Sequence, residues 1–175
     1  MKDTEETVEV MLEKEKVEQR IRELAQEINR DYAGKKIHLI CILKGSVFFT
    51  CELAKHIKEP CSIDFMSVSS YGDNMESSGK IEIKKDLDES IEGLDVLIIE
   101  DIIDSGRTLA TLKQELLARN PASLRICTLL DKPDRRVAQI EVEYTGFSIP
   151  DEFVVGYGLD FAQRYRNLPY IGKIV

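Results

Sequence analysis

The chain has 175 residues, of which 43% are hydrophobic and 32% are charged, and its net charge at pH 7 is −8. This length and composition predict a single globular domain over residues 1–175 and exclude a disordered chain. The acidic balance argues against a broad electrostatic hold on nucleic acid, so any bound phosphate must be met by locally placed donors.

The N-terminal segment and the cysteines both predict a cytoplasmic protein. Residues 1–16 contain no apolar signal core, and no apolar run approaches the roughly 18 residues of a membrane span. The cysteines lack CxxC spacing and lie mostly in apolar segments, at Cys41, Cys51, Cys61 and Cys127. We interpret them as reduced, packed thiols, with a disulfide or a zinc site as the alternative.

The first predicted element is an amphipathic helix over residues 13–31. Its apolar residues, from Val17 to Ile28, recur at the spacing of a single helical stripe. Gly34 lies just beyond the pattern and is a plausible stop signal. The stripe predicts that one face of this helix packs against a core.

The following segments alternate between strand and helix patterns. IHLICIL (37–43) is apolar nearly throughout, as in a strand covered on both faces, and residues 45–57 read as a helix. Residues 61–68 predict a further strand. The stretch 69–80 is polar and rich in Gly and Ser, which is typical of a mobile loop, and residues 81–87 resume a strand-like alternation.

The second half of the chain repeats the same unit. VLIIED (96–101) predicts a buried strand, and a turn then leads to a helix with apolar residues from Leu109 to Leu116. Asn120-Pro121 closes that helix, and residues 124–130 supply another buried strand. Apolar strands that alternate with helices predict an α/β fold, with a mainly parallel sheet and helices on both faces.

Three polar clusters follow the ends of these predicted strands. They occupy residues 43–46, 100–108 and 130–136. In an open parallel sheet, ligands bind at the carboxyl ends of the strands. We therefore expect the three clusters to converge on one cleft.

The turn DSGRT has the chemistry of an anion site. Backbone N–H groups from Ser105 to Leu109 open a helix and lack intrahelical partners, and Ser105 and Thr108 add hydroxyls. Hydrogen bonds to a charged group contribute roughly 1.5–3 kcal/mol each, more than the roughly 0.3–1 kcal/mol of the helix dipole. The alternative is a plain N-cap, in which Asp104 or Ser105 caps the helix and nothing binds.

Glu100 and Asp101 stand beside this turn, at the end of the apolar strand. They would repel a phosphate in direct contact, but carboxylates accept hydrogen bonds from sugar hydroxyls or hold Mg²⁺. A ribose 5-phosphate group satisfies both halves of this pattern. The alternative is a solvated acidic strand end.

VLIIEDIIDSGRTL (96–109) resembles the phosphoribosyl pyrophosphate motif of the type I phosphoribosyltransferases. LKGS, the SSYG loop, LLDKPDRR and FVVGYGLDFAQRYRNLPYIG are similar to segments of the hypoxanthine-guanine branch, in the same order over roughly residues 10–172. The resemblance implies a mainly parallel central sheet flanked by helices, with a small hood region. It also implies Mg²⁺-dependent transfer of phosphoribosyl pyrophosphate to a 6-oxopurine base, which yields IMP or GMP and pyrophosphate.

The resemblance assigns the phosphoribosyl group to the residues Glu100, Asp101, Asp104, Ser105, Gly106, Arg107 and Thr108. Glu100, Asp101 and Asp160 are implied to hold the metal. Asp104 is implied to be the general base near purine N7, a role typically worth about 10²–10⁴ in rate.

Pyrophosphate is assigned by the same resemblance to Lys44, Gly45 and Arg166, and the family has a non-proline cis peptide before this lysine. From the residues alone, the alternatives are a solvated lysine at a helix start for Lys44 and an ordinary surface arginine for Arg166. Ser70 and Tyr71 match the family's lid, which would exclude water from an oxocarbenium-like transition state.

The purine is assigned to Lys132, Phe153, Val154 and Asp160. Lys132 is implied to donate to the 6-oxo group, and a donor there finds no acceptor on the 6-amino group of adenine. Phe153 would stack on the ring. From the residues alone, Phe153 and Val154 would be core positions.

Some polar residues match no site. His38 is predicted as a structural strand residue and His56 as a structural helix-end residue. Arg135 and Arg136 form a basic patch that is either a subunit interface or a solvated turn. The family implies a homodimer or homotetramer, and neither nucleic acid nor a membrane is expected as a partner.

Two other functions fit parts of this pattern. One is a transferase that prefers xanthine, which would need a donor facing the purine 2-oxo group. The other is a regulatory protein that binds a nucleotide without turnover. The presence of Asp104, Lys132 and Arg166 argues against that second alternative, because a pure binder needs neither a base nor a leaving-group clamp.

Overall fold

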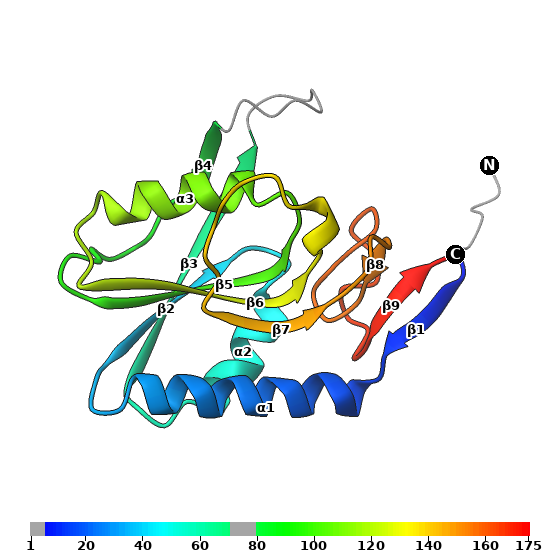
Figure 1. Cartoon of the computed structure of the whole chain (residues 1–175), viewed down its shortest axis with the longest axis horizontal. Helices are drawn as coiled ribbons and strands as arrows, with labels where there is room; N and C mark the ends of the chain where they lie inside the picture. The colour runs from blue at the N-terminus through cyan, green and yellow to red at the C-terminus, as the bar shows by residue number, and fades with distance from the viewer. Residues whose placement is uncertain (1–5, 71–79) are drawn as a thin grey trace.

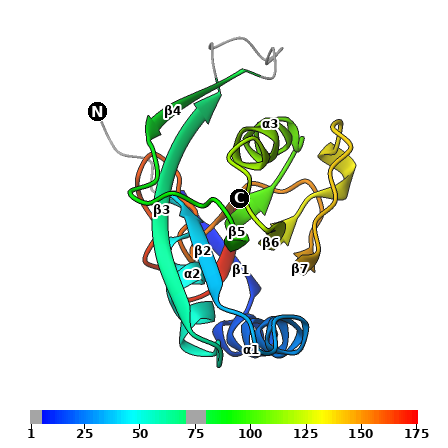
Figure 2. The same ribbon diagram turned by 90° about the vertical axis from the view of Figure 1, so that its left-hand side faces the viewer.

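The computed structural model describes residues 6–70 and 80–175, and its main feature is a twisted six-stranded sheet (Figures 1 and 2). The strand order is β4-β3-β2-β5-β6-β7. The strands are β2 (Ile37–Ile42), β3 (Cys61–Ser70), β4 (Ile81–Lys85), β5 (Asp95–Ile103), β6 (Ser123–Asp131) and β7 (Tyr144–Ser148). All neighbours are parallel except β3 and β4. This confirms the predicted α/β class.

Helices cover both faces of this sheet. Helices α1 (Lys14–Asp31) and α2 (Val47–Lys55) lie on one face and α3 (Arg107–Leu117) on the other (Figure 1). Alternate residues of each strand serve the two cores: Leu97 packs in the cluster of α1 and α2, and Ile98 packs with α3. Both faces are thus apolar, which explains why the central strands read as continuous hydrophobic runs.

Helix α1 has the predicted stripe. Val17, Ile21 and Ile28 are completely buried, and the helix ends at Asp31 as expected. Arg20 fixes its outer side to β7, because its guanidinium donates to the carbonyl oxygens of Thr145 at 2.7 Å and of Gly146 at 2.9 Å.

A second, three-stranded antiparallel sheet joins the two ends of the described chain (Figure 1). It consists of β1 (Val8–Leu12), β9 (Ile171–Ile174) and β8 (Val154–Val155), in that order. Residues 149–170 connect β7 of the main sheet to β9 of the small sheet and include β8; we call them the hood segment. The sequence pattern did not predict β1, β7, β8 or β9, although the resemblance implied a small hood.

The expectation for the cysteines is only half right. Cys41 and Cys127 are buried, but Cys51 on α2 and Cys61 at the start of β3 are exposed, and all four thiols are unpaired. The two buried cysteines lie within the continuous apolar runs of β2 and β6, whereas Cys51 and Cys61 lie outside such runs, where their element faces solvent. His38 lies in β2 and His56 directly follows α2, as predicted. Within the described residues, no helix is both long and apolar enough to cross a membrane.

Candidate active site

The three predicted polar clusters converge at the carboxyl edge of the main sheet. Two cavities open there, of about 190 Å³ and about 260 Å³. The smaller is lined by residues from Glu100 to Leu109, and the larger by residues that include Asp101, Lys132 and Val154. Ile102 and Asp104 line both. One carboxylate therefore stands at the junction of two adjoining spaces.

The smaller cavity is shaped by the start of α3. Gly106 is the N-cap, with φ +79°, and no side chain caps the helix. Ser105 Oγ accepts a hydrogen bond from the N–H of Arg107 at 3.3 Å. The left-handed backbone favours glycine. Gly106 rather than Asp104 or Ser105 therefore occupies the N-cap position, and anion binding at this helix start stays a prediction.

Glu100 and Asp101 form a half-buried pair of acids between the two cavities. Burial raises the pKa of Glu100 well above its ordinary value, and the neighbouring charge of Asp101 adds to the effect. Burial also raises the pKa of Asp101, although the N–H of Ile102, which donates to it at 2.7 Å, opposes that change. The strand end is therefore not simply solvated: burial disfavours the charged forms of both acids, and a cation or hydroxyl donors would stabilise them.

The loop after β2 packs directly on this pair. The Leu43–Lys44 peptide is cis, as the resemblance implied. A Cβ atom added to Gly45 would overlap the Asp101 carboxylate, and one added to Gly158 in the hood segment would overlap the carbonyl oxygen of Gly45. Three segments thus meet with no room for a side chain at Gly45.

The acids suit Mg²⁺ only with help from a ligand. No cluster of three or more His, Cys, Asp or Glu side chains fit to hold a metal occurs within residues 6–70 and 80–175. Magnesium commonly takes one or two carboxylates and completes its shell with water and substrate oxygens. Glu100 and Asp101 fit that pattern. Asp160 is already engaged, because its carboxylate faces Arg166 at 3.1 Å and accepts from the N–H of Gln163 at 2.7 Å.

Asp104 does not stand alone at the junction. Its carboxylate accepts a hydrogen bond from Arg135 Nε at 3.0 Å. Arg135 belongs to a short 3₁₀ turn, η1 (Pro133–Arg135), and also faces Asp151 at 3.7 Å. Arg136 pairs with Asp131. Both arginines are therefore paired with acids within the chain, and a subunit interface at this turn stays a prediction.

Lys132 and the start of the hood segment line the larger cavity. Lys132 is 8% exposed, and its ammonium lies 3.5 Å from Asp151. Val154 is buried, whereas Phe153 is 54% exposed and meets Phe161 edge to face at 5.6 Å. The core alternative thus fails for Phe153, whose ring is available to a flat ligand.

Arg166 is tied into the hood segment. Its guanidinium donates to the carbonyl oxygen of Gly158 at 2.7 Å and pairs with Asp160. It is not an ordinary surface arginine. Of the two lid positions, Ser70 ends β3 and is exposed, and Tyr71 lies outside the described residues.

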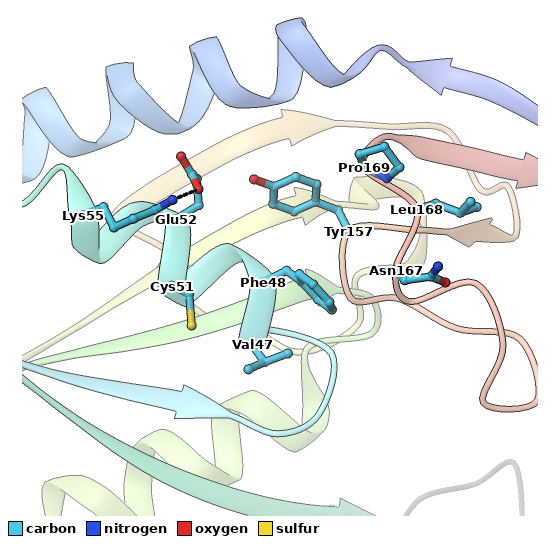
Figure 3. A pocket seen from close by; sticks show the side chains of 9 residues that line it. All are labelled: Val47, Phe48, Cys51, Glu52, Lys55, Tyr157, Asn167, Leu168 and Pro169. Carbon is cyan, nitrogen blue, oxygen red and sulfur yellow. Dashed lines mark ion pairs between the residues drawn. The ribbon is translucent and has the colours of Figure 1, made fainter.

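A larger cavity, of about 450 Å³, lies away from these acids (Figure 3). It runs between the outer face of α2, with Phe48, Cys51 and Lys55, and the end of the hood segment near Pro169. Its lining contains a single carboxylate, that of Glu52, which is already paired with Lys55. Size alone would therefore select the wrong place for the chemistry.

Comparison with known proteins identifies the family of the chain that carries this cleft. The family described as phosphoribosyl transferase domain matches residues 8–162. The chain belongs to the phosphoribosyltransferase family. The hypoxanthine phosphoribosyltransferase of Salmonella typhimurium is 53% identical over 171 residues, which cover 97% of this chain and 96% of that protein.

Solved structures of phosphoribosyltransferases share the fold of this chain. A hypoxanthine-guanine phosphoribosyltransferase from Bacillus anthracis superposes with a TM-score of 0.93 at 48% identity, covering 95% of this chain and 98% of that one. A hypoxanthine phosphoribosyltransferase from Staphylococcus aureus gives 0.93 at 52% identity, covering 95% and 91%.

The structure also brings residues to the cleft that sequence reasoning missed. Asp151 and Gln163 were not singled out, and Arg135 was not connected with Asp104. Their roles depend on side-chain pairs between segments far apart in the chain. Arg135 and Gln163 lie inside segments that resemble the family, whereas Asp151 lies two residues before one and carried no such signal.

Proposed function

We propose that this single-domain phosphoribosyltransferase joins hypoxanthine or guanine to the ribose of phosphoribosyl pyrophosphate, forming IMP or GMP and pyrophosphate in purine salvage. Hypoxanthine and guanine are supported as the bases because the relatives are named hypoxanthine or hypoxanthine-guanine phosphoribosyltransferases. The observation that carries the proposal is the pair of adjoining cavities that share Asp104. One cavity opens at the start of α3, whose N–H groups would donate to a 5-phosphate, and the other is lined by Lys132 and Phe153.

The phosphoribosyl group would lie in the smaller cavity. Amide N–H groups at the start of α3 and the hydroxyls of Ser105 and Thr108 would bind the 5-phosphate, together with Gly106 and Arg107. Glu100 and Asp101 would accept hydrogen bonds from the ribose hydroxyls. Magnesium, held by this acid pair and the substrate oxygens, with Asp160 as a further candidate ligand, would neutralise charge on the departing pyrophosphate.

The purine would lie in the larger cavity, stacked on Phe153 and bounded by Val154 and Asp160. Lys132 would donate to the 6-oxo group, which selects against adenine. N9 of the purine attacks the anomeric carbon of the ribose while the C–O bond to pyrophosphate breaks, and pyrophosphate departs with the electron pair of that bond. Asp104 accepts the proton from N7, so the base in the nucleotide product is neutral.

The loop of Lys44 and Gly45 would face the pyrophosphate together with Arg166. Ser70 and Tyr71 would belong to a lid that closes over the reacting atoms. The proposal includes a homodimer or homotetramer, which sedimentation equilibrium would test. It also includes a cytoplasmic location, which the unpaired thiols support.

Pyrophosphate release tests the reaction directly. The purified chain is incubated with Mg²⁺ and phosphoribosyl pyrophosphate, and hypoxanthine, guanine, xanthine or adenine is added separately. Release with the first two bases only is the expected result. Release mainly with xanthine would replace the proposed specificity, and release with none, alongside retained nucleotide binding in calorimetry, would favour the regulatory protein.

A further inference from the structure

The two cations assigned to pyrophosphate meet on one neutral oxygen. Lys44 Nζ donates to Gln163 Oε1 at 3.2 Å, and Arg166 Nη2 donates to the same atom at 3.2 Å. Lys44 follows β2, whereas Arg166 and Gln163 belong to the hood segment. Two like charges that converge from separate segments repel each other, so an oxygen between them stabilises the arrangement.

The backbone of Gln163 is itself fixed. It has φ +65°, in the left-handed region, between Ala162 at +50° and Tyr165 at +74°. Its N–H donates to Asp160 at 2.7 Å. A run of non-glycine residues in this region is unfavourable and persists only where the surroundings enforce it. The turn therefore aims the amide at the two cations.

We propose that Gln163 is a positioning residue of the pyrophosphate subsite, whose amide oxygen occupies the place of a phosphoryl oxygen between Lys44 and Arg166 until the anion arrives. The inference rests on the proposed function and deepens it. The amide keeps both cations converged before binding, which reduces the reorganisation that binding requires.

The neutrality of the amide is essential to this role. The two hydrogen bonds are exposed to solvent, so an anion with several negative charges displaces the amide readily. A carboxylate at the same place would form ion pairs with Lys44 and Arg166 and compete with the anion. Arg166 keeps its contacts to Gly158 and Asp160 in either case, so the change acts on one subsite and leaves the turn intact.

Calorimetry on the full chain with Mg²⁺ tests the proposal through two ligands, inorganic pyrophosphate and IMP. Gln163→Glu keeps the shape and adds charge, and Gln163→Met keeps the shape and removes the acceptor. We expect the first variant to weaken pyrophosphate binding about tenfold or more, equivalent to about 1.4 kcal/mol, and the second to weaken it about two- to fivefold. IMP affinity stays within about twofold in both, because IMP does not use this subsite.

Gln114→Glu, at an exposed position on α3, is the matched charge control and leaves both affinities unchanged. Unchanged pyrophosphate affinity in Gln163→Glu would overturn the inference alone. An equal loss for IMP and pyrophosphate would also overturn it, since that pattern indicates a merely structural role. If the unmodified chain bound neither ligand, the proposed function would fail together with the inference.

Discussion

The phosphoribosyl loop, residues 100–108, and the hood segment, residues 149–170, line the same cleft in different ways. The loop is short and continuous, and its backbone is set by the end of β5 and the start of α3. The hood segment contains no helix and only the two residues of β8, and it includes four non-glycine residues with positive φ. Distant contacts hold it in place, such as that of Gly158 with Gly45.

The phosphoribosyl loop and the hood segment therefore contribute to the cleft in two different ways. The loop presents donors and acids from rigid elements, so its chemistry depends on individual side chains. In the proposed function the hood segment and the Lys44 loop would position the purine and pyrophosphate groups, so their effect would depend on packing. Substitutions in the loop are therefore expected to remove a chemical step, and those in the hood network to misplace a group.

Asp104→Asn should produce the largest effect. The amide keeps the shape but cannot accept the purine proton, so kcat falls by about 10²–10⁴. Binding of phosphoribosyl pyrophosphate changes little, as calorimetry would show. Asp134→Asn, on the exposed side of the neighbouring turn, is the control and keeps full activity. Near-normal turnover in Asp104→Asn would remove the base from the mechanism.

Gly45→Ala tests whether close packing around Asp101 is needed for activity. The added methyl group must displace the Asp101 carboxylate, and a misplacement of about 1 Å can lower activity about 10²-fold. Steady-state kcat/KM for phosphoribosyl pyrophosphate measures the loss. Gly34→Ala is the control, because it has a positive φ of +78° but no atom within 4 Å of the new methyl group, so it strains the backbone without touching the cleft. Equal losses in both variants would contradict the packing argument.

Glu100→Gln should stabilise the unliganded protein although it weakens the metal site. The folded-state pKa of Glu100 is raised, so the folded protein loses stability as pH rises from the ordinary glutamate value through the raised one. The variant escapes this loss. At pH 8 its Tm should rise by a few degrees, as about 1 kcal/mol would produce, and the gain should vanish near pH 4.

Thermal unfolding followed by circular dichroism at the two pH values measures this difference. Glu115→Gln, at an exposed position on α3, is the matched control and should leave Tm unchanged. A gain that persisted at low pH would show that ionisation of Glu100 is not its cause.

Asp151→Asn should have the smallest effect. It removes the charge that faces Lys132 at 3.5 Å, but the acid is half exposed, and exposed ion pairs contribute only roughly 0.2–1 kcal/mol. We expect KM for hypoxanthine to rise about two- to fivefold with kcat nearly unchanged, because the lysine is held less firmly. Discrimination against adenine should fall in parallel. A large fall in kcat would instead place Asp151 in the chemical step.

Periodicity and local motifs made much of this molecule predictable. The stripe of α1 and the apolar runs of β2, β5 and β6 report burial directly, because one face of the helix and both faces of the strands contact a core. The phosphoribosyl loop was also readable, since a strand end, two acids and a helix start are adjacent in the chain. The buried setting of Glu100 and Asp101 was less evident, because it depends on how other segments cover them.

The sequence by itself determined the parallel sheet, its covering helices and the chemistry-bearing loop after β5, since neighbours in the chain specify these features. Tertiary structure alone decided the small sheet, the exposure of Cys51 and Cys61, and the pairing of Lys44 with Gln163. Short strands and single side chains carry too little local preference to select partners more than a hundred residues away. Their partners are chosen only when the packed core brings those segments together.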